Sequence, residues 1–453
     1  MHWKLKVWEY GKIGSAEIEA APLTLFVGDN NSGKSYLMSL LWGIQNFGVK
    51  TLIDTTKEQD LKEEYVVMDW VRSQVTAAWK TGSSIAFIGE IANELQAVLD
   101  RRLKRNKDKL IQRIFNSQTV KIKDLQIELI DLDKVSLKIA SNRGIDKTEG
   151  HLIWTSDRVR MIGMPFSDER LELLKDTFDW FIFYLIFSMV LEIDIGDTIS
   201  LNQNIYLPAS RTGFMLTKDI INKVGRNTAF NIELESERLS PFTRPVNQFL
   251  DVMDDLTLEE RGSERFKDIT EYLESGMAEG TLELSTLPNR EVSYIPSGQT
   301  EGLPLRTVSA VVTELSPLIL ILKHKRHLNT IFYEEPEMCL HPQLQQKMGK
   351  VICELVNNRL NLIVTTHSDL ILQHINNMIR LARREDKETL CRQFGYKEDD
   401  LLRAEQVKVY QLKSQADGES SVEELLCGEN GFAIPSFNDA LDRIMDEAYT
   451  IQE

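Results

Sequence analysis

The sequence is poor in cysteine and has no long run of apolar residues. Its 453 residues include four cysteines, none in a C-x-x-C pair. They are Cys339, Cys353, Cys391 and Cys427. This spacing indicates neither a zinc cage nor a disulfide framework, and it fits a reducing cytoplasm. The most apolar stretch, Trp180 to Leu191, is shorter than the roughly 20 residues that cross a bilayer. We therefore expect a buried helix there, a cytoplasmic protein and no membrane partner.

Basic charge is also scarce. The chain has 53 Lys and Arg against 69 Asp and Glu, a formal net charge of -16. This balance argues against a general nucleic-acid coat, because phosphate binding requires a basic face. One local basic run, Arg101–Arg113, has the sequence RRLKRNKDKLIQR. It is either a solvated helix face that includes Asp108 or a surface that contacts DNA, so a nucleic-acid partner stays open.

Internal repeats and low-complexity tracts are absent as well, and what remains is an alternation of strand and helix patterns. Short apolar segments such as LNTIFYEEPE and LNLIVTTHSD alternate with helical ones near the C-terminus. This alternation predicts an α/β fold with a parallel sheet covered on both faces. The expected parts are an N-terminal core piece (1–54), a helical insertion (55–116), a core piece with antiparallel strands and a long helix (117–211), a second helical insertion (212–276) and a C-terminal core piece (277–453).

Several boundaries follow from local patterns. Period-two alternation predicts strands over 3–8 and 16–27. The segment SDERLELLKDTFDWFIFYLIFSMVLEI has a capping serine, Ser167, and predicts one long helix. The segment NIYLPASRTG predicts a short strand closed by Pro208, and GTLELSTLPNREVSYIPSG predicts a hairpin.

The stretch FVGDNNSGKSYL begins at Phe26 and contains the first chemical motif. Between an apolar strand pattern and a helical one it matches G-x-x-x-x-G-K-[ST]. In such a loop the backbone N–H groups form a nest for phosphates at the positive end of the next helix. We expect Lys34 to neutralise phosphate charge and Ser35 to bind Mg²⁺. The predicted nucleotide-binding residues are Gly28, Asp29, Asn30, Asn31, Ser32, Gly33, Lys34 and Ser35.

Two carboxylates stand side by side in TIFYEEPEMCLHP, after the apolar strand end Ile331–Tyr333. At the end of a strand Glu334 would reach a magnesium ion and Glu335 would polarise a water molecule, a pairing that suits cleavage of a phosphoanhydride. Solvated acidic residues with no catalytic role are the alternative.

A histidine ends the other apolar strand, in LIVTTHSD. His367 would lie near the γ-phosphate, where it would hydrogen-bond that phosphate or the attacking water. A structural histidine is the alternative.

The order of these elements resembles the ATP-binding-cassette ATPases, in the branch that includes SMC-like repair ATPases and the overcoming-lysogenization-defect ATPases. The resemblance covers the two ends of the chain and implies a head with a mixed or parallel sheet, flanking helices and helical insertions. It implies ATP and Mg²⁺ as cofactors, Gly28–Ser35 as the Walker A loop and Leu340–Pro342 at the D-loop. It also implies Glu334 as the Walker B acid, Glu335 as the catalytic glutamate and His367 as the switch histidine. The family has an aspartate where Glu334 stands.

The family's L-S-G-G-Q signature is replaced here by LRTVSAVVTEL. Ser309 would present its hydroxyl and N–H group to a nucleotide on an opposing subunit, or it is an ordinary N-cap serine. The turn LPASRTG makes Arg211 a candidate for a nucleotide or interface contact. The Q-loop glutamine is not identifiable.

Within the branch, the overall plan resembles the stand-alone ATPases of anti-phage operons, such as those of the PARIS and Septu systems. This implies a homo-oligomer joined through ATP-sandwich interfaces, a phage protein as trigger, and a separate nuclease or toxin as effector. The alternatives are a DNA-binding repair ATPase, an ATPase with its own nuclease, a transporter motor, and a nucleotide-gated scaffold with negligible turnover.

Overall fold

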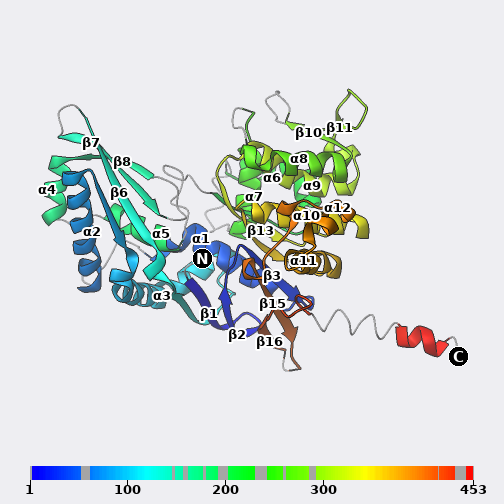
Figure 1. Cartoon of the computed structure of the whole chain (residues 1–453), viewed down its shortest axis with the longest axis horizontal. Helices are drawn as coiled ribbons and strands as arrows, with labels where there is room; N and C mark the ends of the chain where they lie inside the picture. Colours follow the sequence, from blue (N-terminus) through cyan, green and yellow to red (C-terminus); the bar gives the residue numbers. More distant parts are fainter. Residues whose placement is uncertain are drawn as a thin grey trace. The chain divides into compact units, whose positions relative to one another are not determined.

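The computed structural model divides into two compact units (Figure 1). The first comprises Met1–Glu19 and Ser39–Asn204, and the second comprises Ala20–Met38 and Ile205–Glu453. The structure describes residues 3–52, 62–144, 148–156, 162–176, 180–191, 203–229, 242–258, 262–284, 292–416, 418–433 and 445–451. The predicted boundary at 54 and the turn of the predicted hairpin, 285–291, lie outside the described residues.

The first unit contains antiparallel strands and the helices that pack on them. One group pairs in the order β5-β1-β2, and a four-stranded group pairs in the order β4-β6-β7-β8. The strands are β1 (Trp3–Tyr10), β2 (Ile13–Glu19), β4 (Ser83–Phe87), β5 (Ile122–Leu129), β6 (Ser136–Arg143), β7 (Glu149–Ser156) and β8 (Ile162–Ser167). The helices are α2 (Lys62–Thr81), α3 (Ala92–Phe115), α4 (Asp168–Asp176) and α5 (Trp180–Leu191).

The predicted helical insertion over 55–116 contains helices α2 and α3, but it also contains a strand that was not predicted. Strand β4 lies between α2 and α3 and pairs antiparallel with β6. Gly82 ends α2 with a φ of 98°, a backbone conformation that glycine adopts most readily. Ile85 pairs with Lys138, and a partner so far away in the sequence leaves no trace in local periodicity.

The apolar stretch from Trp180 to Leu191 is a helix, as expected, and Leu191 accepts a hydrogen bond from the indole of Trp3 at 3.3 Å. The predicted long helix appears as α4 and α5, with 177–179 outside the described residues. Ser167 caps α4, since its hydroxyl accepts from the backbone N–H of Arg170 at 3.2 Å. None of the described helices combines the length and the apolar character needed to span a bilayer.

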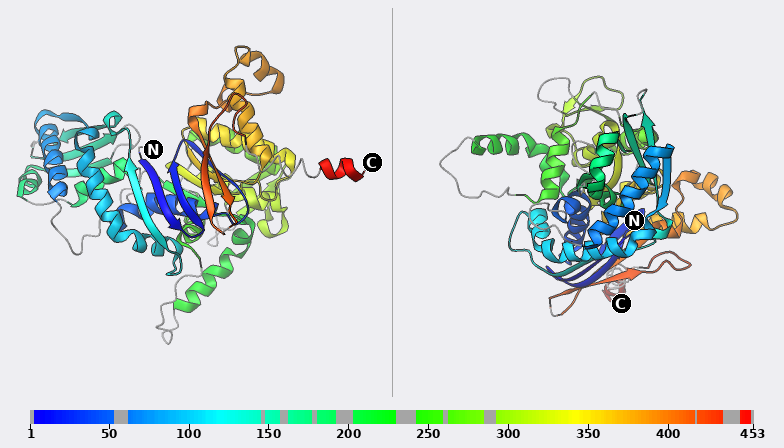
Figure 2. Two further views of the ribbon diagram at one scale, coloured as in Figure 1. Left: turned by 90° about the horizontal axis from the view of Figure 1, so that it is seen from below. Right: turned by 90° about the vertical axis from the view of Figure 1, so that its left-hand side faces the viewer.

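The second unit is built on a mixed sheet, which confirms the predicted α/β class. Its strands pair in the order β16-β15-β3-β14-β13-β9, and β15, β3, β14 and β13 are parallel neighbours. They are β3 (Leu23–Gly28), β9 (Gln203–Leu207), β13 (Leu328–Glu334), β14 (Asn361–Thr365), β15 (Val407–Ser414) and β16 (Ser420–Leu425). Figure 2 shows the blue β3 beside the orange β15, although they come from opposite ends of the chain.

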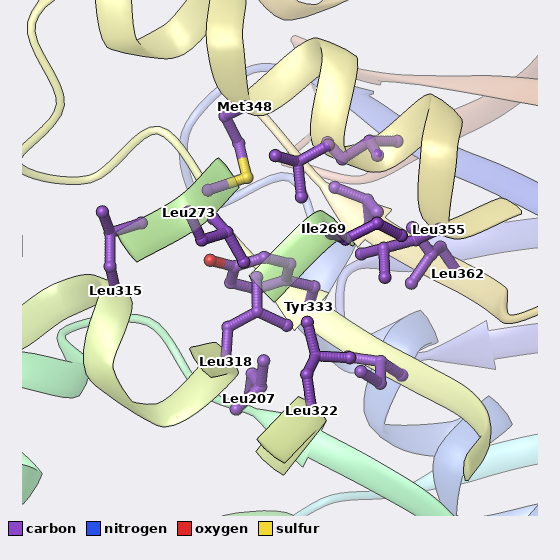
Figure 3. Close-up of a cluster of buried hydrophobic side chains, with 14 of the residues drawn as sticks. Leu207, Ile269, Leu273, Leu315, Leu318, Leu322, Tyr333, Met348, Leu355 and Leu362 are labelled. Carbon is purple, nitrogen blue, oxygen red and sulfur yellow. The ribbon is translucent and has the colours of Figure 1, made fainter. Parts of the chain in front are cut away.

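Helices cover this sheet and complete its core. Tyr333 on β13 packs among Leu318, Leu322 and Met348 (Figure 3). The helices of the second unit are α6 (Arg211–Ala229), α7 (Arg244–Asp254), α8 (Lys267–Tyr272), α9 (Ala310–His324), α10 (Pro342–Asn357), α11 (Asp369–Ala382) and α12 (Lys387–Phe394). The predicted hairpin is present as β10 (Gly280–Leu284) and β11 (Val292–Pro296). All residues of β3 are buried, as a central parallel strand requires.

The register of the parallel strands brings three strand ends together. Glu334 at the end of β13 pairs with Thr365 at the end of β14, and Thr365 pairs with Phe26 near the end of β3. The loops that follow these strands therefore leave the sheet at one edge. The helix after β3 is α1 (Lys34–Leu52), whose first residues belong to this unit.

Candidate functional site

The loop between β3 and α1 makes a turn that needs glycine. Gly28, Asn31 and Gly33 have φ angles of 125°, 60° and 101°. A Cβ on Gly28 would lie 2.0 Å from the carbonyl oxygen of Leu412 on β15. The tight approach leaves backbone atoms, and no side chain, at the start of the loop. A side chain at position 28 would therefore collide with the backbone of β15.

Lys34 lies back across this loop and is almost fully buried. Its Nζ donates to the carbonyl oxygens of Gly28 at 3.0 Å and Asp29 at 2.6 Å. An ammonium group has three donors, so one is left for an anion. Burial lowers the pKa of Lys34, while the charges of Glu335, Asp29 and Glu337 act to raise it.

Ser32, in the same loop, is fully buried and its hydroxyl has no hydrogen-bond partner among the described residues. A buried hydroxyl without a partner is costly unless a ligand or water supplies one. This hydroxyl, the backbone cradle and the lysine together fit a phosphate chain. Asn30 lies within the loop, and Ser35 is the second residue of α1.

The two adjacent glutamates differ in their surroundings. Glu334 is buried, and its Oε2 accepts from the backbone N–H of Ala209 at 2.9 Å. Glu335 is half-buried, has a φ of 42°, and places Oε1 3.8 Å from Nε2 of His367. Burial raises the pKa of Glu335, helped by the charge of Glu334 and opposed by that of Lys34. A carboxylate with a raised pKa is a stronger base than an exposed glutamate and is suited to accept a proton.

His367 follows β14 and faces Glu335. Burial lowers its pKa and the charge of Lys34 adds to that effect, which favours the neutral imidazole. The structure therefore places Lys34, Glu335 and His367 close enough for their charges to interact. A neutral imidazole with one donor and one acceptor can hydrogen-bond a phosphate oxygen or a water.

Glu337 is a site residue that the sequence did not single out. Its carboxylate accepts from the hydroxyl of Thr366 at 3.0 Å and from the backbone N–H of His367 at 2.5 Å. Burial raises its pKa, while these hydrogen bonds act to lower it. In the sequence, Glu337 could have been recognised as a candidate because it is the third carboxylate in the run Glu334-Glu335-Pro336-Glu337. Glu337 thereby fixes the backbone that carries His367.

The expectation of a nucleotide or interface contact for Arg211 is wrong. Arg211 is fully buried and forms an ion pair with Glu314 at 2.8 Å. Its guanidinium donates to the carbonyl oxygens of Pro208 at 2.9 Å, Glu334 at 2.5 Å and Glu335 at 3.0 Å. The side chain is therefore enclosed within the protein, where it stabilises the backbone of Glu334 and Glu335.

Ser309 is exposed and caps α9, with its hydroxyl accepting from the N–H of Val312 at 3.4 Å. This is the N-cap geometry that the sequence allowed as an alternative. Exposure leaves the hydroxyl accessible to another molecule, so its contact with an opposing subunit stays a prediction.

The basic run on α3 in the first unit is partly neutralised within the fold. Arg101 lies 2.5 Å from Glu63, and the buried Arg102 lies 2.5 Å from Glu64. These pairs favour the helix-face interpretation of the run over a DNA-contacting one. Among the described residues no group of three or more His, Cys, Asp or Glu side chains is arranged to hold a metal by itself.

The sequence of residues 1–372 matches the AAA ATPase domain family. No curated protein matches the chain. Among solved structures it is similar to an Smc head bound to the C-winged helix domain of ScpA, at 15% identity and a TM-score of 0.37 over 93% of this chain and 97% of that one. It is similar to the SMC head domain from Thermotoga maritima, at 11% identity and a TM-score of 0.33 over 93% and 98%. It is also similar to an Smc head domain with an extended coiled coil, bound to the C-terminal domain of ScpA derived from Pyrococcus furiosus, at 15% identity and a TM-score of 0.38 over 99% of both chains.

Proposed function

Because the chain belongs to the AAA ATPase domain family, we propose that it binds ATP at the Gly28–Ser35 loop and hydrolyses it to ADP and phosphate. One observation carries the proposal: Lys34, Glu335 and His367 meet at one edge of a parallel sheet, beside a glycine cradle. Ligands of open α/β sheets bind at the carboxyl ends of the strands. This edge is therefore where a nucleotide would lie.

The residues of this site would have different chemical roles. Backbone N–H groups from Gly28 to Ser35 would hold the phosphates, and Lys34 would offset their charge. Ser35 and Glu334 would hold Mg²⁺, which supplies charge neutralisation of the phosphates when bound. Glu335 would accept a proton from a water molecule, and the neutral imidazole of His367 would orient that water or a phosphate oxygen.

Assembly is the second part of the proposal. Ser309 is exposed at the N-terminal end of α9, where free N–H groups attract anions. We infer that it completes the pocket of a second copy, so that ATP holds two chains together and hydrolysis releases them. A branch-specific role follows from the sequence resemblance: an ATP-gated oligomer of anti-phage defence that senses a phage protein and controls a separate nuclease or toxin.

The test of the ATPase is calorimetry with Mg-ATP together with a phosphate-release assay. Lys34→Ala should abolish ATP binding. Lys267→Ala is the control: this lysine is exposed and lies outside the candidate site, so the variant should bind ATP as the unmodified protein does. Glu335→Gln should keep binding and lower kcat by about 10²–10⁴-fold. Tight ATP binding by Lys34→Ala would contradict the loop assignment, and unchanged turnover in Glu335→Gln would contradict the catalytic one.

The assembly is tested by mass measurement. Glu335→Gln with ATP should form a larger species than the same protein with ADP, and Ser309→Ala in that background should weaken it. Co-purification of the Glu335→Gln protein with the products of its native operon should then identify the effector. If the mass is the same with ATP and with ADP, ATP does not hold two chains together. If no second protein co-purifies from the native operon, the proposed control of an effector is contradicted.

A further inference from the structure

Arg211 and Glu314 are charged, buried and unused by the chemistry above, and they lie under the acidic pair. We propose that these two residues form a positioning clamp that holds the backbone at Glu334 and Glu335 and ties it to α9. The inference rests on the proposed ATP hydrolysis and adds to it a connection between the catalytic glutamate and the Ser309 end of α9.

The backbone at Glu335 needs such a clamp. Its φ of 42° lies in the left-handed region, which residues with a Cβ adopt only where the surroundings hold them. On one side its N–H donates to the carbonyl oxygen of Thr365 at 2.9 Å. On the other its carbonyl oxygen accepts from Arg211 at 3.0 Å and from the N–H of Met338 at 3.1 Å. The direction of the Glu335 side chain is set by this strained backbone.

Arg211 donates hydrogen bonds to the carbonyl oxygens of two consecutive residues. Its Nη1 donates to the carbonyl oxygen of Glu334 at 2.5 Å, and its Nη2 donates to that of Glu335 at 3.0 Å. The planar fork of a guanidinium can bridge two carbonyl oxygens in this way, whereas the ammonium of a lysine is a single point donor. The type of side chain, and not its charge alone, therefore matters at this position.

Glu314 balances the buried charge of the guanidinium. It forms the ion pair with Arg211 at 2.8 Å, and the two side chains are 2% and 0% exposed. Its Oε2 accepts from the N–H of Thr212 at 2.8 Å and from the Thr212 hydroxyl at 2.7 Å. The guanidinium also lies over the ring of Tyr333, 4.7 Å from its centre. Tyr333 is surrounded by apolar side chains (Figure 3), so the clamp is closed off from water.

The clamp joins the acidic pair to α9. Glu314 lies in this helix, five residues after its N-cap Ser309. At a rise of about 1.5 Å per residue, the two positions are about 7.5 Å apart along the helix axis. In the proposed sandwich, Glu335 serves the chain's own nucleotide and Ser309 serves the nucleotide of the neighbour. A movement at one of these groups therefore reaches the other through a buried ion pair.

The test compares turnover with binding in Arg211→Lys and Glu314→Gln. Both should bind Mg-ATP within about threefold of the unmodified protein, since neither side chain contacts the loop. Both should lower kcat by about 10–100-fold, because a small misplacement of a catalytic group is costly. Lys218→Met is the matched control: this residue on α6 pairs with Asp254 at 2.9 Å, and the variant should retain the kcat of the unmodified protein.

A double-mutant cycle separates a clamp from two independent effects. If the residues act together, the combined Arg211→Lys and Glu314→Gln variant should lose no more kcat than the more affected single variant. Multiplying losses would overturn the proposal. Should a single variant fail to fold, Arg211→Met combined with Glu314→Leu replaces the ion pair by apolar groups, which buried sites often tolerate. That protein should fold, bind ATP and hydrolyse it slowly, and full kcat in it would overturn the clamp.

The outcomes separate this inference from the ATPase itself. If the unmodified protein binds no Mg-ATP, the proposed function fails. If the unmodified protein hydrolyses ATP and the clamp variants only melt at lower temperature, with kcat per folded molecule unchanged, the ATPase stands and the positioning role is refuted. Loss of binding equal to the loss of kcat would also refute it.

Discussion

Replacing Gly28 by alanine tests whether the phosphate cradle depends on bare backbone. Gly28 has a φ of 125°, and the added Cβ would lie 2.0 Å from the carbonyl oxygen of Leu412. That oxygen belongs to the backbone of the neighbouring strand β15, so it cannot move aside as a flexible side chain would. We expect β3 and β15 to be forced apart at the site where the loop begins.

Two costs add at this position. A residue with a Cβ held in such a backbone conformation costs about 1–3 kcal/mol, and forcing a group into filled space costs about another 1–3 kcal/mol. Gly395 provides the control in the same unit: its φ is 73° and a Cβ there would meet nothing within 4 Å. Gly395→Ala therefore has only the conformational cost, about 1–2 kcal/mol. The difference between the two variants measures the overlap at Gly28 together with the larger conformational cost of a φ of 125° compared with 73°.

The assay has two parts. Guanidinium denaturation followed by circular dichroism gives the free energy of unfolding of both variants, and hydrogen exchange of the β3 and β15 amides shows where Gly28→Ala loosens the sheet. Calorimetry with Mg-ATP should find binding in Gly395→Ala and none in Gly28→Ala. If Gly28→Ala is as stable as Gly395→Ala and still binds ATP, the cradle does not depend on the close approach of Gly28 to β15.

Three further predictions concern charge. Burial and Asp400 raise the pKa of Glu354 to about 7. A folded-state pKa above the unfolded value of about 4.5 favours folding at low pH, so the free energy of unfolding should fall by up to about 3 kcal/mol between pH 4.5 and 7. Glu354→Gln should remove this dependence of stability on pH. If the dependence persists in the variant, Glu354 is not its source. Arg102→Ala leaves the buried Glu64 unpaired and should lower the free energy of unfolding by about 3–5 kcal/mol, whereas Arg101→Ala, at an exposed pair, should lower it by less than about 1 kcal/mol. Tryptophan fluorescence reports the unfolding of both variants, because all seven tryptophans lie in the first unit. Equal losses would refute the role of burial. Finally, the raised pKa of Glu335 should make ATP hydrolysis decline on acidification earlier than an exposed glutamate would, and a flat rate down to pH 5 argues against a proton-accepting role.

Much of the second unit could be predicted because its signals are local. The glycine loop, the strand ends at Glu334 and Thr365, and the capping serine of α9 are short patterns whose geometry depends on neighbours in sequence. Parallel pairing then follows from the length of the connections. The same logic failed for β4, a five-residue strand between two helices, since its pairing with β6 depends on residues about fifty positions away.

The sequence by itself identified the glycine loop, the acidic pair and the histidine as candidate site residues, because glycine conformation, strand ends and charged side chains carry their chemistry in the residue type. Only the tertiary structure decided what surrounds them. It buried Arg211 against Glu314, more than a hundred residues away, and it made Glu337 the support of His367. Burial and ion pairing arise from contacts between distant segments, and a residue's type leaves open whether its charge faces water, a ligand or another charge.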